Sequence, residues 1–200
     1  MQYPLFFDEV DSILLYDPLS DFLGAFEEGK VEISYLDCVK QAGHSCPTVA
    51  GAYLMTIIGL KTLYSSELPQ RGNIYVEIKG KKTEGTIGVI ANIISYIIGA
   101  NGEEGFKGIQ GKFSRNNLIA YDQQMAGEVT FKRMDNNLSV SLSYDPSIIP
   151  GDQRLKPLIG KVLQGKASDQ ENNLFKELWQ ERVKDILLTK ELRNKMIQVV

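Results

Sequence analysis

The segment Gly43-His44-Ser45-Cys46-Pro47 constrains the fold more than any other stretch, because it combines a helix stop with a helix start. Glycine readily takes the left-handed conformation that ends helices, so we expect Gly43 to end one. Proline is favoured at the first helical position, where its missing N–H is not needed, and Pro47 therefore predicts the start of the next helix. Cys46 becomes the N-cap of that helix, where the helix dipole and free N–H groups favour a thiolate. His44 and Ser45 then form a two-residue corner.

Hydrophobic spacing and capping residues divide the rest of the chain into helices and strands. The predicted helices span residues 18–29, 35–42, 47–64 and 87–98, one follows residues 150–152, and a last long helix follows Ser168. The predicted strands span residues 13–16, 73–79, 127–133 and 138–144, with turn residues 135–137 joining the last two into a hairpin. We expect an α+β fold, in which helices accompany a mixed or antiparallel sheet with a late β-hairpin. Residues 1–150 form the core domain, and residues 151–200 form a helical extension packed on the core or on a second subunit.

Composition excludes several classes of partner. Apolar residues make up 43% of the 200 residues, which suffices for a hydrophobic core. The net charge of −3 argues against nucleic acid, because phosphate binding needs a basic face. The first nine residues lack the basic region of a secretion signal, which favours the cytoplasm. The apolar run 87–98 is too short to span a bilayer, so we expect a buried helix and no membrane partner.

The chemistry of the chain centres on His44, its only histidine, and Cys46, one of two cysteines. Imidazole and thiolate are good zinc ligands, and the same pair can act in catalysis with Cys46 as nucleophile and His44 as its base. Zinc prefers four ligands, so others must come from Cys38, a carboxylate such as Glu77 or Glu84, water, or a second subunit. Cys38 is alternatively an ordinary buried cysteine.

A glycine-containing loop over residues 101–117 is the second candidate site. Glycines permit close approach of the backbone to a ligand, and Lys112 and Arg115 carry the positive charge that binds an anion. We therefore expect these two residues to bind the anionic group of a small molecule or cofactor. The alternative is an ordinary surface loop.

The corner segment resembles a known family signature. Ala42–Pro47 followed by Gly51 is similar to the His-Gly-His-x-Cys-Pro-Gly…Gly signature of the FmdE-like family, whose members are related to a component of formylmethanofuran dehydrogenase. Looser similarity covers about residues 34–134. Ala42 stands where the family has its first histidine, and Thr48 where it has the glycine after proline.

The resemblance implies an α+β core, a zinc site on the signature residues, and frequently a homodimer. His44 and Cys46 match the signature ligands. The cysteine-rich zinc finger that some members carry at the C-terminus is missing, because no cysteine follows Cys46.

These observations predict a zinc-binding protein or metalloenzyme of unknown substrate, with His44, Cys46 and Cys38 as candidate ligands. One alternative is a metal-free accessory subunit that keeps the fold without the site. The other is a thiol-dependent enzyme that uses Cys46. Whether the protein is an enzyme at all stays open at this stage.

Overall fold

A computed structural model describes residues 2–200. The helices are α1 (Pro18–Leu23), α2 (Tyr35–Ala42), α3 (Pro47–Tyr64), α4 (Ile87–Ile98), α5 (Leu155–Leu163), α6 (Asp169–Leu188) and α7 (Arg193–Met196). The strands are β1 (Ile13–Tyr16), β2 (Lys30–Ile33), β3 (Ile74–Ile78), β4 (Ile119–Ala120), β5 (Val129–Arg133), β6 (Ser139–Tyr144) and β7 (Ile197–Val199). Short 3-10 turns are η1 (Leu5–Glu9), η2 (Glu27–Gly29), η3 (Pro146–Ile148) and η4 (Lys190–Leu192). The α+β class predicted from the sequence is confirmed.

The main sheet has the strand order β4-β3-β5-β6-β7. Its β3–β4 pair is parallel and the other pairs are antiparallel, so the sheet is mixed. The register places Val76, Phe131 and Val140 side by side across three strands. These side chains are buried, and burying a large apolar side chain contributes about 1.5–3 kcal/mol. They face the helices that cover this side of the sheet.

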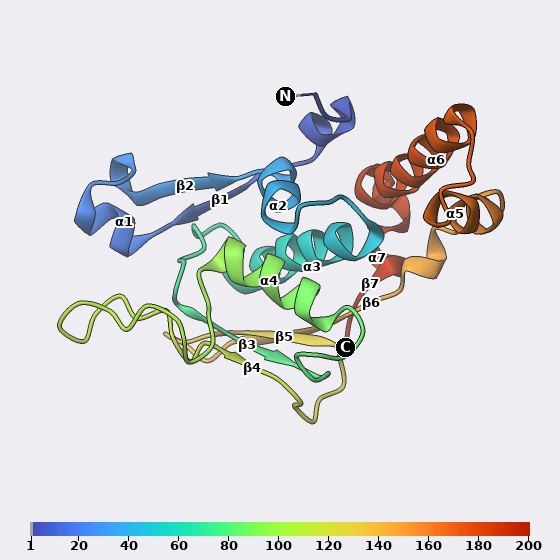
Figure 1. Cartoon of the computed structure of the whole chain (residues 1–200). Helices are drawn as coiled ribbons and strands as arrows, with labels where there is room; N and C mark the ends of the chain where they lie inside the picture. Colours follow the sequence, from blue (N-terminus) through green and yellow to red (C-terminus); the bar gives the residue numbers. More distant parts are fainter. Residues whose placement is uncertain (1) are drawn as a thin grey trace.

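Helices α3 and α4 lie on one face of the main sheet, and α2 packs on both of them (Figure 1). Helix α3 is buried nearly all round, because it lies between the sheet, α2, α4 and α6. Glycines let the sheet approach it closely. A side chain at Gly51 would collide with the ring of Tyr144, and a Cβ at Gly59 would lie 2.7 Å from the Phe131 ring.

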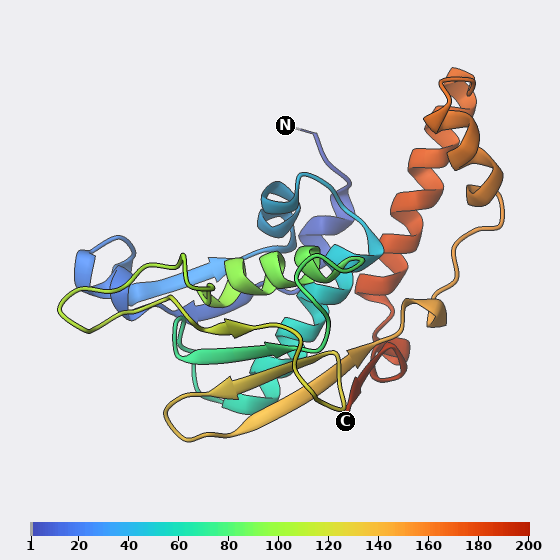
Figure 2. The ribbon, with the colours of Figure 1, turned by 60° about the horizontal axis from the view of Figure 1, so that its bottom comes forward.

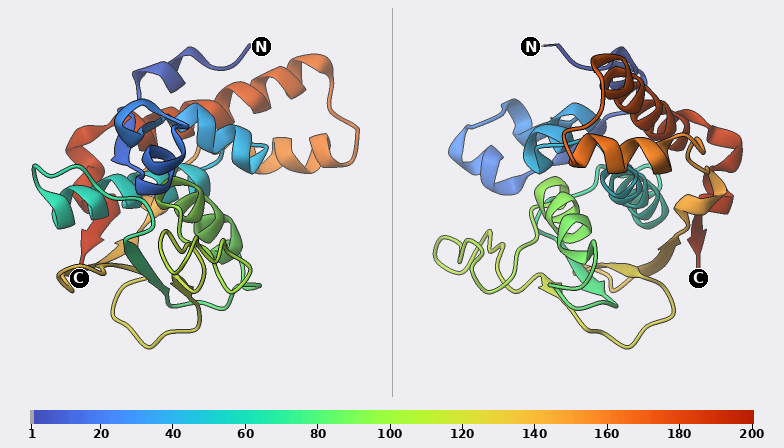
Figure 3. Two further views of the ribbon diagram at one scale, coloured as in Figure 1. Left: turned by 90° about the vertical axis from the view of Figure 1, so that its left-hand side faces the viewer. Right: turned by 45° about the vertical axis from the view of Figure 1, so that its right-hand side comes forward.

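Helix α5 packs against α6, and the two project from the body of the molecule (Figures 2 and 3). The other end of α6 contacts α3. After α7 the chain returns to the main sheet, where β7 pairs with β6 through Leu142↔Val199 and Tyr144↔Ile197. Residues 151–200 therefore contribute both a projecting helical pair and a strand of the core sheet.

Strands β1 and β2 form a separate antiparallel ribbon at the side of the molecule where α1 lies (Figure 1). Val31 and Ile33 are buried, whereas Lys30 and Glu32 are exposed. The ribbon reaches the region of the main sheet through the backbone of Tyr16, whose N–H donates to Pro69 O at 2.9 Å.

Local sequence signals placed most helix starts correctly. Ser34 and Asp37 form a capping box at the start of α2, with Asp37 N 3.2 Å from Ser34 Oγ and Ser34 N 3.0 Å from Asp37 Oδ2. Ser168 and Glu171 form the same arrangement at the start of α6. In each case two otherwise unpaired N–H groups of the first turn gain partners.

The predicted helix over residues 18–29 is wrong in its length. It starts as expected, with Asp17 as N-cap and Pro18 at the first position, but Gly24 ends it in the left-handed conformation with φ 66°. Residues 30–33, for which no strand was predicted, then pair with β1. The apolar run 87–98 is the expected buried helix, and no helix in the described part of the chain has both the length and the apolarity needed to cross a membrane.

Candidate functional site

The corner between α2 and α3 has the local structure that the sequence predicts. Gly43 ends α2 with φ 73°, and Pro47 is the first residue of α3. Cys46 is the N-cap, and its Sγ accepts a hydrogen bond from the N–H of Val49 at 3.5 Å. The thiol therefore occupies the free N–H end of a long helix, the position in which a cap stabilises a helix.

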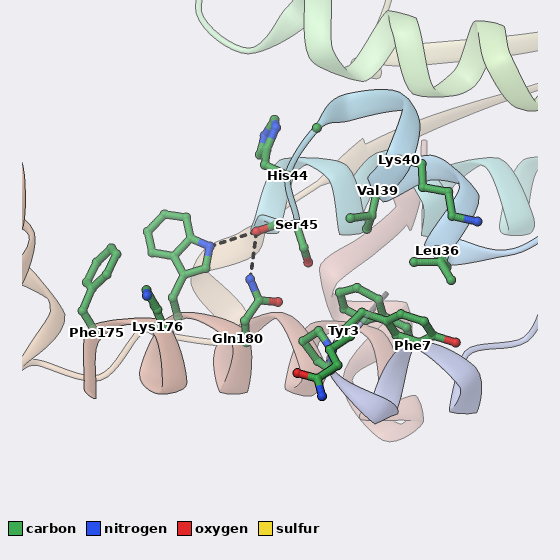
Figure 4. Close-up of a pocket in the computed structure, with 14 residues that line it drawn as sticks. Tyr3, Phe7, Leu36, Val39, Lys40, His44, Ser45, Phe175, Lys176 and Gln180 are labelled. Carbon is green, nitrogen blue, oxygen red and sulfur yellow. Dashed lines mark hydrogen bonds between the residues drawn. The ribbon is translucent and has the colours of Figure 1, made fainter. Parts of the chain in front are cut away.

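His44 is exposed at this corner, and its ring is oriented by the backbone. Nδ1 lies 3.0 Å from the carbonyl oxygen of Ala42. A carbonyl oxygen only accepts, so Nδ1 donates in this contact, and in a neutral ring Nε2 is then the nitrogen with the lone pair that binds metals. The ring points toward α4 rather than along α6 (Figure 4). It lines a small cavity of about 110 Å³ against Asn92 and Ile93 of α4.

Cys46 is half-buried and lies near two tyrosines. Two nearby tyrosine hydroxyls are already hydrogen-bonded, Tyr144 donating to Pro47 O at 2.9 Å and Tyr35 sharing a bond with Ser45 Oγ at 3.0 Å. Burial raises the pKa of each of these tyrosines well above the ordinary value of a tyrosine. Both therefore stay protonated at neutral pH, and neither can act there as a phenolate base for the thiol.

Cys38 is the predicted third ligand, and the structure places it inside the core. Its side chain is 0% exposed on the inner face of α2. Burial, with a smaller effect from the charge of Asp37, raises the pKa of this thiol to about 12. The thiol form is therefore retained at neutral pH, whereas zinc binds the thiolate.

The other predicted donors do not complete a metal site within this chain. Glu77 lies on β3 with its partners in the sheet, and Glu84 accepts the backbone N–H of Lys81 at 3.3 Å ahead of α4. Across residues 2–200 no group of three or more His, Cys, Asp or Glu side chains is arranged to hold a metal ion. The described residues alone therefore do not fit a four-ligand zinc site.

A larger cleft opens beside the corner, between η1, α2 and α6 (Figure 4). Its volume is about 710 Å³, within the range of roughly 300–1,000 Å³ typical of small-molecule sites. Aromatic and aliphatic side chains form most of its wall: Tyr3, Phe7, Leu36, Val39, Phe175 and Trp179. The corner itself contributes His44 and Ser45.

Helix α6 is fixed to the corner by two hydrogen bonds to one carbonyl. Trp179 Nε1 and Gln180 Nε2 both donate to Ser45 O, at 3.0 Å and 3.2 Å. The Oε1 atom of Gln180 is buried and has no hydrogen-bond partner in the described chain.

The charged side chains of the cleft are all cationic. Lys40 and Lys176 line it, and no lining residue is an aspartate or glutamate. Lys40 forms an exposed ion pair with Asp37 at 3.3 Å. Lys176 has no ion pair within the described residues. The cleft is thus an apolar space with positive charge at its edge.

Lys112 and Arg115, the predicted anion-binding pair, line a different cavity. Arg115 is largely buried and its Nη2 donates to Asp17 Oδ1 at 2.6 Å, whereas Lys112 is exposed. The structure thus brings these two residues together, apart from the corner.

The cleft itself was missed by the sequence analysis. No sequence motif assigns a functional role to Trp179, Tyr3 or Phe7. A cleft formed by residues 3–7 and 175–180 arises only from tertiary packing. No pattern within either segment could have revealed it.

Searches against models of protein families and against curated proteins find no match to this chain.

Proposed function

We propose that this protein binds a small, largely apolar molecule with an anionic group in the cleft between η1, α2 and α6. The observation that carries the proposal is an aromatic-walled space of about 710 Å³ whose charged side chains are all cationic. Aromatic walls favour flat apolar ligands, because stacked or edge-on aromatic pairs gain about 0.5–1.5 kcal/mol beyond burial. The expected address of such a protein is the cytoplasm.

The chain's only tryptophan lies in the cleft and provides the assay. The probe is anilinonaphthalene sulfonate, an aromatic anion that accepts energy from tryptophan. We expect saturable one-site binding that quenches Trp179 emission. Phe175→Ala, which removes part of the aromatic wall, should weaken binding.

Charge reversal separates this site from general surface adsorption. Lys176→Glu should weaken the probe roughly fivefold to tenfold, because it replaces an attraction by a repulsion at a partly solvated site. Lys184→Glu changes the same charge on the same helix outside the cleft and should leave affinity unchanged. Equal effects of the two substitutions, or binding that does not saturate, would contradict the proposal.

A second candidate function is zinc binding, which the family resemblance implies. The observation in its favour is the Nδ1 contact of His44 with Ala42 O, because ligating histidines commonly use their other nitrogen in this way. Donors from a second copy in a homodimer would supplement His44 and Cys46.

Elemental analysis of protein purified without a histidine tag tests the zinc candidate. About one zinc per chain or per dimer is expected, with loss of metal in His44→Ala and a dimer by light scattering. If the wild-type protein takes up no zinc when it is supplied, the metal-free accessory subunit and the Cys46 thiol enzyme are the remaining alternatives. The pH dependence of the rate of Cys46 alkylation then distinguishes the two, because a nucleophilic cysteine forms its thiolate well below the free-cysteine pKa of about 8.5.

A further inference from the structure

A second cavity lies near α1, where the loop over residues 101–117 runs alongside that helix (Figure 2). Its volume is about 550 Å³. Arg71, Lys112 and Arg115 line it, and no lining residue is an aspartate or glutamate. The stacked rings of Phe22 and Phe113, 5.2 Å apart, join the loop to α1.

Arg115 is held rigidly in this cavity wall. Its side chain is 8% exposed and its Nη2 donates to Asp17 Oδ1 at 2.6 Å. The guanidinium passes between two glycines. A Cβ at Gly72 would lie 2.7 Å from Nε, and one at Gly99 would collide with Nη1. Both positions must therefore be glycine for Arg115 to lie there.

Arg71 and Arg115 differ in how many of their donors are used. Arg71 donates Nη1 to Asp17 Oδ2 at 2.9 Å and its other two nitrogens to the carbonyls of Tyr96 and Ile97 at the end of α4. Each nitrogen of the Arg71 guanidinium thus donates one hydrogen bond within the protein. The one recorded hydrogen bond from the Arg115 side chain is donated by Nη2, so Nε and Nη1 donate none within residues 2–200.

The cluster also carries an unbalanced charge. Two guanidinium groups share the single carboxylate of Asp17, which leaves one positive charge in excess. Lys112 adds a second at the exposed side. Buried charges are normally paired, because burying an isolated ion costs much free energy. This excess is local, since the whole chain has a net charge of −3.

We propose that this cavity binds the phosphate group of a small phosphorylated molecule. Arg115 donates to a phosphate oxygen from Nε, which lies beside the lining residue Gly72, and Lys112 covers the group from the solvent side. The cavity is larger than a phosphate ion, so it has room for the rest of the ligand. Asp17 and Arg71 position Arg115 and do not contact the ligand. The site is independent of the cleft beside His44.

Isothermal titration calorimetry with inorganic pyrophosphate, at fixed ionic strength, is the test. We expect saturable binding of one pyrophosphate per chain. Lys112→Glu should lower the affinity by about tenfold or more, because a charged hydrogen-bond donor is replaced by a repelling carboxylate. Lys107→Glu makes the same change in the same loop outside the cavity and should leave affinity within about twofold.

Two further experiments test whether the site prefers phosphate and whether it is separate from the cleft. Citrate replaces pyrophosphate as a carboxylate anion of comparable charge, and Lys176→Glu tests independence from the cleft. Absence of pyrophosphate binding in the millimolar range, tighter binding of citrate, or equal losses in the two loop variants would overturn the proposal. Loss of pyrophosphate binding in Lys176→Glu would show that the anion binds in the cleft instead. Both loop positions are exposed, so folding is retained and circular dichroism verifies it.

Discussion

Replacing Asp17 by asparagine should destabilise the protein strongly, because this carboxylate neutralises two guanidinium groups. Removing one partner of a buried ion pair costs about 3–5 kcal/mol. Arg71 is 19% exposed and so keeps partial access to water, which places the expected loss near the lower end, at about 3 kcal/mol. Asparagine can still accept the N–H groups of Leu19 and Ser20 that Asp17 caps. Asp17→Ala loses these bonds as well and should cost about 1 kcal/mol more.

Urea unfolding followed by circular dichroism measures this loss. With a slope of about 2–3 kcal/mol per molar urea, the midpoint of Asp17→Asn should fall by about 1–1.5 M at unchanged slope. Asp21→Asn is the matched control, because Asp21 lies on the same helix but is exposed and bonds only the Tyr16 hydroxyl at 3.0 Å. A loss below about 0.5 kcal/mol in Asp17→Asn, typical of surface positions, would refute the role of the cluster.

The dependence on pH provides a second check on Asp17. Burial alone would raise the pKa of this carboxyl, but the Ser20 N–H and the charges of Arg115 and Arg71 outweigh it, so the pKa is lowered. When the pKa of a carboxyl is lower in the folded state than in the unfolded state, its contribution to stability is complete above the unfolded-state pKa of about 3.9. That contribution is lost as the pH falls through the folded-state pKa. The difference between wild type and Asp17→Asn should therefore be constant near neutral pH and shrink below about pH 4. A difference that persists in strong acid would contradict this assignment.

Two further predictions concern single side chains. Iodoacetamide should modify the native protein once, at the half-buried Cys46, and should modify the fully buried Cys38 only after unfolding. Mass spectrometry of the digested protein identifies the labelled cysteine. Labelling of Cys38 before Cys46 would contradict the structure. Gly51→Ala should destabilise by about 1–3 kcal/mol, because the new methyl group collides with the Tyr144 ring and outweighs the better helix propensity of alanine. Gly160→Ala, on α5 with no atom near the added methyl group, should instead stabilise the protein by about 0.5–1 kcal/mol in the same urea assay. If both substitutions changed the free energy of unfolding in the same direction, the packing argument would be wrong.

Elements with a strong local signal were predictable from the sequence. Helix α3 begins at Pro47, and the late hairpin forms β5 and β6 around the predicted turn. The signals for these elements lie within a few residues of one another. Tertiary contacts did not have to be known.

Elements whose stability comes from distant partners were not predictable. Phe22, Leu23 and Phe26 have the spacing of a buried helix face, yet they are 62%, 61% and 54% exposed and the helix ends at Gly24. Strand β2 has only four residues, and it is a strand because β1 pairs with it. Its short alternation of polar and apolar residues was too weak a signal on its own.

The candidate sites divide in the same way. The cap at Cys46 follows from its immediate neighbours. Asp17 pairs with Arg71 and Arg115, which lie 54 and 98 positions away in the sequence. The spacing of residues along the chain does not predict such a pairing. The zinc ligands and the dimer stay predictions.

The β1–β2 ribbon leaves the outer edge of β2 without a partner strand in the described chain. An open strand edge is a template for association with other chains, and charged side chains are a common protection against it. Lys30 and Glu32 stand on that strand, exposed and alternating with its buried residues. The solubility of the native state thus depends in part on two surface charges with no role in either cavity, and replacing both by valine would turn this edge into a site of intermolecular β-sheet growth.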